Sequence, residues 1–354
     1  MTPSNVKPPH VHIVGAGLIG ASVGLGLSDA GWAVTIEDND PRVERIARGI
    51  GSGEALTKTA QPDLVIVAVP PSCAVDAVVA SLRRWPDAVV TDVASVKAPI
   101  AAAVEAERSS DRYVGSHPMA GREVSGVESA QGDLFKARPW VVCANGATAE
   151  ATDLVRAVAD ALGADVVTTE ASAHDEAVAR VSHAPQVVSS AVAASLAGLE
   201  KDDLALVGQG YRDTTRIAHS DPAMWVDIAR LNADNLKAAL GRIVDDLERV
   251  RDSEDVGEAL ADLIQRGRGE LERIPGKHGG RQRHWVEIVV IAPDKPGQLL
   301  RLLTDVAALD INVEDLAIEH SPRQKVGLVM LSVEPARAAE LVESLTEKGW
   351  EVVQ

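Results

Sequence analysis

Aromatic residues are scarce in this chain of 354 residues: they make up 3% of it, and only one is Phe and two are Tyr. Hydrophobic residues still reach 46%, which is ample for a sizeable core and argues against disorder. The core is therefore expected to consist of small aliphatic side chains, chiefly Ala, Val and Leu. A chain of this length is expected to form two or three domains.

Basic charge and cysteine are also in short supply. The chain has 35 Lys and Arg against 52 Asp and Glu, and its formal net charge is −17. Such a surface repels phosphates, so we predict no nucleic-acid or anionic-membrane partner, although a few Arg and His residues can still make one pocket positive. The two cysteines, Cys73 and Cys143, favour buried free thiols in a reducing compartment, with one disulfide as the alternative.

Long apolar runs are absent as well. No run approaches the roughly 20 residues that span a bilayer, and residues 1–9 are polar and Pro-rich with no apolar signal core. We therefore expect a cytoplasmic protein whose residues 1–9 are disordered. No cluster of His, Cys and carboxylates has the spacing of a metal site, so no metal is predicted.

Short continuous apolar runs dominate the first half of the chain, as is typical of strands that are buried on both faces. They alternate with helical patterns, which predicts a doubly wound, mostly parallel sheet over residues 10–170. The runs are Val11–Val14, Ala33–Ile36, Leu64–Val69, Ala88–Thr91, Tyr113–Gly115, Trp140–Cys143 and Asp165–Thr168.

From about Ala171 the apolar spacing becomes helical. Ser220-Asp221-Pro222 places a capping residue before Pro, which predicts a helix start. An apolar stripe follows from Trp225 to Leu247, and a further helix is expected from Asp255 to about Ile274. Three long helices with such broad apolar faces predict an all-helical domain over residues 171–275 that forms a homodimer.

After a Gly-rich, basic linker at residues 276–283, strand-like and helical patterns alternate again in the last part of the chain. Residues 284–354 are predicted to form a ferredoxin-like βαββαβ domain. Its expected elements are strand 286–291, helix 298–309, strands 312–319 and 325–333, helix 336–348 and strand 350–353.

A glycine-rich turn, residues 15–20, follows the first strand and opens a helical run. This context is typical of a Rossmann-type dinucleotide site. Gly15 permits the tight turn, Gly17 lets a pyrophosphate approach the backbone, and Gly20 allows close helix packing. Leu18 and Ile19 lie at the helix N-terminus, whose free amides favour phosphate.

The second strand ends in Glu37 and Asp38. A carboxylate at this position accepts hydrogen bonds from the ribose hydroxyls and repels a 2′-phosphate. The nearest Arg that could bind such a phosphate is Arg42. The sequence therefore favours NAD over NADP, with Asp38 ahead of Glu37 as the ribose ligand.

Four later segments carry polar residues in motif-like spacing. The first two directly follow strands, at the edge where open α/β sheets bind ligands. The segments are Thr91-Asp92-Val93-Ala94-Ser95-Val96-Lys97, Gly115-Ser116-His117-Pro118-Met119-Ala120-Gly121, Ser182-His183-Ala184-Pro185-Gln186 and Tyr211-Arg212-Asp213-Thr214-Thr215-Arg216-Ile217-Ala218.

With the glycine turn, these segments resemble the prephenate/arogenate dehydrogenase family, in family order, from about His10 to Ile274. The tail resembles an ACT domain, with residues 294–299 as its first-loop signature. The resemblance implies NAD-dependent oxidative decarboxylation of prephenate to 4-hydroxyphenylpyruvate, in tyrosine biosynthesis.

The resemblance also implies residue roles. His117 would accept the proton of the substrate hydroxyl, for which a near-neutral imidazole is suited. Ser95 would lie near that hydroxyl and the nicotinamide, although it could instead cap the following helix. Arg216 would grip a substrate carboxylate, although it could instead pair with a nearby Asp, and Ser182 would line the substrate pocket.

One position departs from the family pattern. Many prephenate-using members read Ser-His-x-Pro-His where this chain has Gln186, near the substrate side chain. A neutral amide could serve the ketone of prephenate or the ammonium of arogenate. Arogenate dehydrogenase therefore remains the alternative.

ACT domains commonly pair and bind an amino acid at their interface, near the Pro-Gly loop. The resemblance therefore implies feedback inhibition by tyrosine, with a purely structural dimerisation module as the alternative. The expected regulatory residues are Asp294, Gly297, Gln298, Leu299, Asn312 and Val313.

Two other functions compete. Dehydrogenases of β-hydroxy acids use a catalytic Lys in the helical domain, but Lys201 and Lys237 lie in no convincing site motif. A regulatory protein that binds nucleotide and amino acid without turnover is the other alternative. The complete set of Ser95, His117 and Arg216 argues against it.

Overall fold

The computed structural model describes residues 8–121, 126–274, 285–320 and 326–353. The chain divides into two compact units, Met1–Asp245 and Asp246–Gln354. The predicted linker at residues 276–283, and residues 1–7 of the predicted disordered N-terminus, lie outside the described residues. Among the helices of the described part, none is long and apolar enough to cross a membrane.

The first unit contains a seven-stranded sheet in the order β2-β1-β3-β4-β5-β6-β7. All neighbouring strands are parallel except β5 and β6, which are antiparallel. The predicted mostly parallel sheet is therefore confirmed. The strands are β1 (His10–Val14), β2 (Ala33–Glu37), β3 (Leu64–Val67), β4 (Val89–Asp92), β5 (Tyr113–Pro118), β6 (Pro139–Cys143) and β7 (Asp165–Thr168).

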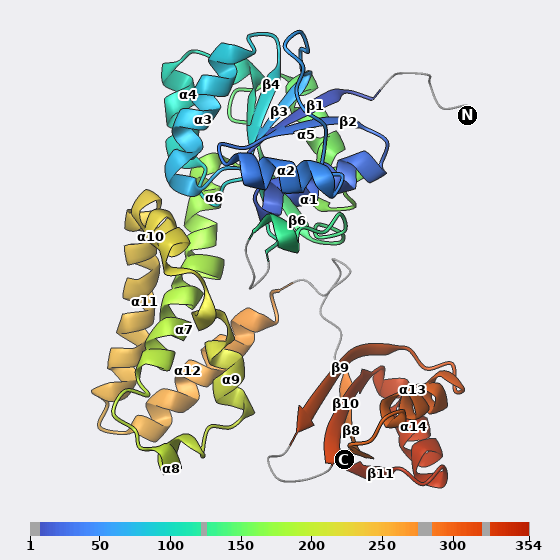
Figure 1. Cartoon of the computed structure of the whole chain (residues 1–354). Helices are drawn as coiled ribbons and strands as arrows, with labels where there is room; N and C mark the ends of the chain where they lie inside the picture. Colours follow the sequence, from blue (N-terminus) through green and yellow to red (C-terminus); the bar gives the residue numbers. More distant parts are fainter. Residues whose placement is uncertain (1–7, 122–125, 275–284, 321–325, 354) are drawn as a thin grey trace. The chain divides into compact units, whose positions relative to one another are not determined.

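Helices flank this sheet, with α3 and α4 together on one side and α1 and α2 away from them (Figure 1). Each side of the sheet has its own buried cluster, one around Phe135 and Trp140 and the other around Trp85 and Tyr113. The helices are α1 (Leu18–Asp29), α2 (Pro41–Gly49), α3 (Pro71–Arg84), α4 (Ala98–Ala106) and α5 (Ala149–Ala161), with short 3₁₀ turns η1 (Ser110–Arg112) and η2 (Val127–Ser129).

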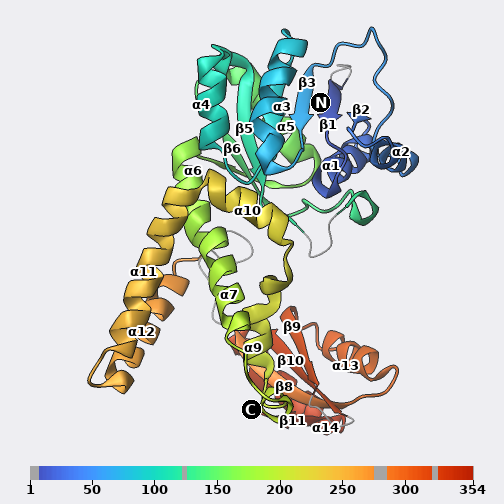
Figure 2. The same ribbon diagram turned by 60° about the vertical axis from the view of Figure 1, so that its left-hand side comes forward.

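The chain from Ala171 to Leu271 is entirely helical apart from its connections, as predicted. Helices α7 and α11 run side by side (Figure 2), and Ala184, Leu236 and Ala239 are buried together with Ala179. The elements are α6 (Ala171–Val178), η3 (Ala179–His183), α7 (Ala184–Ala194), α8 (Lys201–Leu204), α9 (Gln209–Thr215), η4 (Arg216–His219), α10 (Pro222–Leu231), α11 (Ala233–Arg251) and α12 (Val256–Leu271).

Two helices differ from the simple periodic expectation. The apolar stripe from Trp225 to Leu247 is divided at Asn232, whose backbone angles are not helical, so α10 ends there. The side-chain NH₂ group of Asn232 donates to the backbone carbonyl of Asp175 at 2.8 Å. The first long helix is interrupted by the π-helical turn η3. The turn η3 contains Ser182 and His183, and Asn232 lies beside His183.

The second unit ends in a four-stranded antiparallel sheet in the order β11-β8-β10-β9. Its elements follow the predicted βαββαβ order, with a core that includes Leu302, Leu331 and Leu341. They are β8 (Val286–Pro293), α13 (Gln298–Ala307), β9 (Val313–His320), β10 (Val326–Val333), α14 (Pro335–Glu347) and β11 (Glu351–Val353).

Close packing of α1 depends on its glycines. A Cβ atom at Gly24 would lie 2.0 Å from the carbonyl oxygen of Ser52, whereas one at the exposed helical Gly241 would meet no atom of the described residues within 4 Å. We expect Gly24→Ala to lower the free energy of unfolding by about 1–3 kcal/mol. The matched Gly241→Ala should raise it by up to about 1 kcal/mol, because Ala favours a helix. Urea unfolding of both variants tests this, and equal effects would contradict it.

Candidate active site

The glycine turn is built as a dinucleotide site requires. Gly15 has φ +99°, and a Cβ atom there would lie 2.5 Å from the carbonyl oxygen of Ala68. At Gly20 a Cβ would lie 2.0 Å from the carbonyl oxygen of Gly15. Gly17, at the N-cap of α1, has no described protein atom within 4 Å of such a Cβ. The start of α1 is therefore open to a ligand phosphate.

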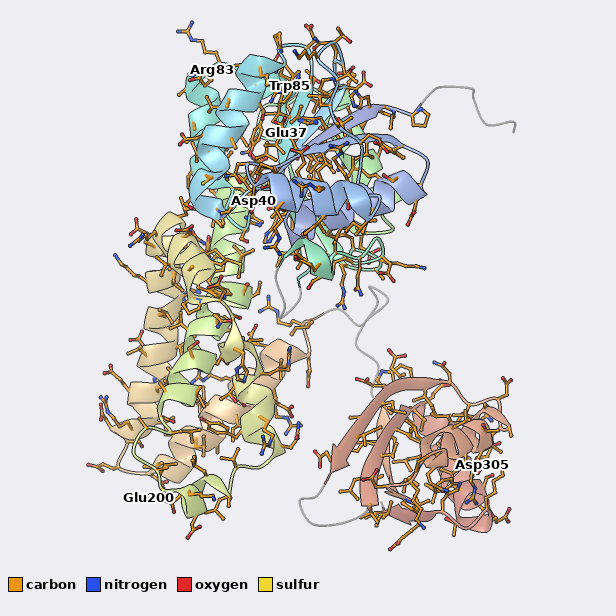
Figure 3. The ribbon with its side chains drawn as sticks, viewed as in Figure 1. Glu37, Asp40, Arg83, Trp85, Glu200 and Asp305 are labelled. Carbon is orange, nitrogen blue, oxygen red and sulfur yellow. The ribbon has the colours of Figure 1, made fainter. Side chains whose placement is uncertain are left out.

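The two acidic residues at the end of β2 have different surroundings. One carboxylate oxygen of Asp38 accepts from the backbone N–H of Ala16 in the glycine turn at 2.7 Å. Glu37 instead binds Arg84 at 2.8 Å and lies 3.4 Å from His12. The neighbouring imidazole of His12, and then the guanidinium of Arg84, hold the pKa of Glu37 below its ordinary value although burial opposes this. Of the two, Asp38 is the one placed at the glycine turn; Figure 3 labels its neighbours Glu37 and Asp40.

A buried ion pair joins β4, α4 and β5. The ammonium of Lys97 contacts Oδ1 of Asp92 and donates to the carbonyl of Ser116 at 2.7 Å, and both charged side chains are at most 1% exposed. The hydroxyl of Tyr113 donates to Oδ2 of Asp92 at 2.7 Å. Burial, and then the charge of Asp92, raises the pKa of Tyr113 well above its usual value. The connection that carries Ser95 is thereby fixed against the strand that carries His117.

His117 is half-buried near the end of β5 and touches a second histidine. Its Nδ1 lies 2.9 Å from Nε2 of His174, and Nδ1 of His174 lies 2.8 Å from Oδ1 of Asp175. Desolvation, followed by the charge of Lys97 and by the histidines His174 and His183, lowers the pKa of His117 well below 6.5. At neutral pH its imidazole is therefore uncharged and can accept a proton.

Gln186 connects two elements of the helical region. Its Nε2 donates to the carbonyl of Ile217 in η4 at 3.0 Å, and its Oε1 accepts from the hydroxyl of Ser220 at 3.2 Å. The residue is 7% exposed. Gln186 thus holds η4, which begins with Arg216, against α7; Arg216 itself is exposed.

Two family models match the chain in succession. Residues 23–168 match the prephenate dehydrogenase nucleotide-binding domain, and residues 170–263 match the prephenate dehydrogenase dimerization domain. A relative in Streptomyces niveus, named as a probable prephenate dehydrogenase NovF, is 31% identical over 96% of this chain and 98% of its own length. The chain belongs to the prephenate dehydrogenase family.

Other relatives agree with this assignment. The prephenate dehydrogenase of Lactococcus lactis is 29% identical over 95% of this chain and 98% of its own length. The structure of prephenate dehydrogenase from A. aeolicus, solved with hydroxyphenyl propionate and NAD⁺, matches 76% of this chain and all of its own at 28% identity, with a TM-score of 0.67. The arogenate dehydrogenase of Synechocystis matches 75% of this chain and 99% of its own at 27% identity, with a TM-score of 0.64.

The motif residues of this prephenate dehydrogenase family member come from adjacent elements. Ser95 follows β4 and His117 is the second-last residue of β5, and the two strands are paired. Helix α4 begins at Ala98 with Lys97 at the N-cap, so Ser95 does not occupy the cap position that we considered for it. Ser182 is half-buried within the π-helical turn η3.

His183 has the surroundings of a structural histidine. It is 2% exposed, Nδ2 of Asn232 approaches its Nδ1 at 3.3 Å, and its ring packs edge-on against Trp225. Desolvation lowers its pKa to about 4, although the charge of Asp175 opposes this. This neutral side chain supports the packing of α10 on η3.

His174, Asp175 and Asn232 lie outside the motif segments from which the site residues were predicted. In the structure His174 and Asp175 connect His117 to the start of α4. The only signal in the sequence is a His-Asp pair in the first turns of the helix that follows the sheet. Such a pair is common on exposed helices, so its role emerges only from tertiary contacts.

The predicted regulatory residues fall into two separate groups. Asp294 to Leu299 lie where β8 leads into α13, and Gly297 has φ +84° at the N-cap. Val313 pairs with Val333 at the level of Val286, at the other end of β8. Asn312 and Val313 therefore lie at the opposite end of the strands from residues 294–299, and one protomer does not bring the two groups together.

The buried ion pair should control both stability and the acidity of His117. We expect Lys97→Met to lower the free energy of unfolding by about 3–5 kcal/mol, because Asp92 is left as an unpaired buried charge. The pKa of His117 should rise, because the repulsion of a nearby ammonium is removed. NMR titration of the His117 ring and urea unfolding measure the two effects. The exposed Lys136→Met is the control, with an expected change within about 0.5 kcal/mol, and an unchanged His117 titration in Lys97→Met would contradict the assignment.

Proposed function

We propose that this protein is an NAD-dependent prephenate dehydrogenase, which converts prephenate to 4-hydroxyphenylpyruvate in tyrosine biosynthesis. The observation that carries the proposal is the neutral His117, held at the carboxyl edge of the sheet beside the Ser95 connection. NAD is supported by the matching nucleotide-binding domain, by the relative solved with NAD⁺, and by Asp38 at the glycine turn.

The residues fit this cofactor. Gly17 leaves the start of α1 open, and Asp38 presents a carboxylate beside the turn for the ribose hydroxyls. The guanidinium of Arg42 is 3.4 Å from Glu128, and this pairing weakens it as a site for a 2′-phosphate. Bound at this turn, NAD⁺ would supply the hydride acceptor.

The side chains of this protein would then transfer one proton and position the substrate. Nε2 of His117 accepts the proton of the substrate hydroxyl as the ring carbon that bears it loses a hydride. The bond to the ring carboxylate breaks, its electron pair enters the ring, and carbon dioxide leaves. Because the ring becomes aromatic, this step needs little assistance. Arg216 binds a substrate carboxylate, while Ser95 and Ser182 position the hydroxyl and the ring.

Arogenate is the second candidate substrate, which the similarity to the Synechocystis arogenate dehydrogenase favours. The amide of Gln186 is neutral and already bonded at both ends to Ile217 and Ser220. It therefore offers no charge with which to select the ammonium of arogenate over the ketone of prephenate. We infer that Gln186 acts on the substrate through the position of η4.

The proposed activity is tested by NADH absorbance with purified enzyme, NAD⁺ and either prephenate or arogenate. We expect turnover of prephenate, constant through neutral pH and falling only below about pH 6.5, because His117 must be unprotonated and its pKa is lowered. His117→Asn should lower kcat by about 10²- to 10⁴-fold. A preference for arogenate would reassign the substrate alone, and turnover of neither would favour a non-catalytic binding protein.

We propose a homodimer as the working unit. Helix α12 contains no buried residue, and it exposes Val256, Leu260, Ile264 and Leu271 at helical spacing. Apolar faces of this kind are typically covered by a partner. The match to a dimerization-domain model supports the same arrangement.

The C-terminal βαββαβ domain is proposed to be an ACT domain that binds tyrosine. Its two groups of candidate residues lie at opposite ends of the strands of one sheet, so a site that uses both needs two copies of the domain. Such a site would make effector binding depend on the arrangement of the dimer, as feedback inhibition requires.

Removal of the residues after Gly276 should leave prephenate turnover in place and abolish inhibition by tyrosine. Initial rates of the full and the shortened chain, measured over a tyrosine titration, make the comparison. Inhibition of the full chain should not be overcome by excess prephenate. Equal inhibition of both chains, competitive with prephenate, would instead place tyrosine in the active site.

A further inference from the structure

The contacts behind His117 form a continuous chain of hydrogen bonds to a carboxylate. His174 is 2% exposed and Asp175 is 1% exposed, so water does not compete effectively for these bonds. The two links are 2.9 Å between the histidines and 2.8 Å between His174 and Asp175. Both distances are those of well-formed hydrogen bonds.

The carboxylate determines the direction of every bond in this chain. An ionised Asp175 can only accept, so Nδ1 of His174 must carry a proton. A neutral imidazole has one ring proton, which leaves Nε2 of His174 as an acceptor. His117 must then donate through Nδ1–H, and its lone pair is on Nε2. This is the tautomer in which His117 can accept a proton from a substrate.

Asp175 is itself held by groups from two regions of the fold. Its carboxylate accepts from the backbone N–H of Lys97 at 2.7 Å and of Ala98 at 2.8 Å, the first amides of α4. Asn232, between α10 and α11, donates to its backbone carbonyl at 2.8 Å. The amides at a helix N-terminus favour negative charge, which keeps the carboxylate an acceptor.

We propose that His174 and Asp175 are positioning residues of the dehydrogenase reaction, which fix His117 in the tautomer whose Nε2 accepts the hydroxyl proton. This inference rests on the proposed function. When His117 becomes positively charged, its bond to His174 strengthens, and the charge of Asp175 stabilises it through that ring. The same carboxylate fixes the start of α4, and with it the connection that carries Ser95.

The discriminating substitution is Asp175→Asn. With its amide oxygen at the position of Oδ2, the side chain still accepts from the N–H of Ala98. Its NH₂ group then takes the position of Oδ1, where it faces Nδ1 of His174 and no longer accepts from the N–H of Lys97. The chain of donors reverses, and His117 carries its proton on Nε2, where it blocks acceptance. We expect kcat to fall by about 10³- to 10⁴-fold, as when a catalytic histidine is held in the wrong tautomer. The KM for NAD⁺ should change less than about twofold, because the glycine turn is untouched.

Two matched variants separate positioning from structure. In His174→Gln the amide oxygen can accept from Nδ1–H of His117 and preserve its tautomer, so kcat should stay within about tenfold of the original. Glu176→Gln removes the exposed carboxylate next to Asp175 and should leave the rate unchanged. Nitrogen-15 NMR of the histidine rings should show His117 protonated on Nδ1 in the full enzyme and on Nε2 in Asp175→Asn.

The outcomes distinguish this proposal from the proposed function. If His117→Asn abolishes turnover but Asp175→Asn is as active as the original, the positioning role is wrong and the function stands. If His117→Asn retains full activity, the proposed function loses its central residue. The proposal would also be wrong if, in the full enzyme, Nδ1 of His117 were unprotonated and His174 doubly protonated. The NMR spectrum of the full enzyme therefore tests the tautomer of His117 even if Asp175→Asn fails to fold.

Discussion

The buried ion pair of Lys97 and Asp92 is the interaction on which the candidate site depends. A buried ammonium needs an opposite charge beside it, and here the ammonium of Lys97 contacts the carboxylate of Asp92 and the backbone carbonyl of Ser116. These contacts connect the end of β4, the start of α4 and the end of β5. The two strands deliver Ser95 and His117, so the geometry of the proposed chemistry is set by a charge pair that does not take part in it.

The same charge has a second effect. The ammonium of Lys97 is one cause of the lowered pKa of His117, after desolvation. Asp175 then joins the backbone of Lys97 and Ala98 to His174. Residues 92 to 98 thus fix the position, the protonation and, through His174, the orientation of one imidazole. One short connection between β4 and α4 therefore determines both the position and the protonation of His117.

Much of the fold was predictable because its signals are local. The seven sheet strands, the Asp221-Pro222 helix start and the βαββαβ order all follow from periodicity and turn residues, and the structure confirms them. The family followed from the glycine turn and the four later motif segments, and the comparisons confirm it. The roles of Ser95, His117 and Arg216 remain predictions that the placement of these residues supports.

The rest depended on contacts between residues far apart in the chain. Asp175 meets Lys97 across 78 positions, and Asn232 meets Asp175 across 57. The spacing of apolar residues along the sequence does not indicate which distant residues form such pairs. The same limit applies to the bonds of Gln186 to Ile217 and Ser220, and to the separation of Asn312 from Gly297 along the strands.

The π-helical turn η3 contains one residue more than an α-helical turn would need. An α-helix advances by about 100° for each residue, so that extra residue rotates everything after it by more than a quarter turn. Ser182 and His183 lie within η3, and Gln186 follows in α7. The face that this helix turns toward Asn232 and η4 is therefore set by a change of register, which no substitution of a single side chain could reproduce. Loss of one residue here would move the whole face at once, so a change in the length of this helix, more than a change in its composition, would alter which side chains face Asn232 and η4.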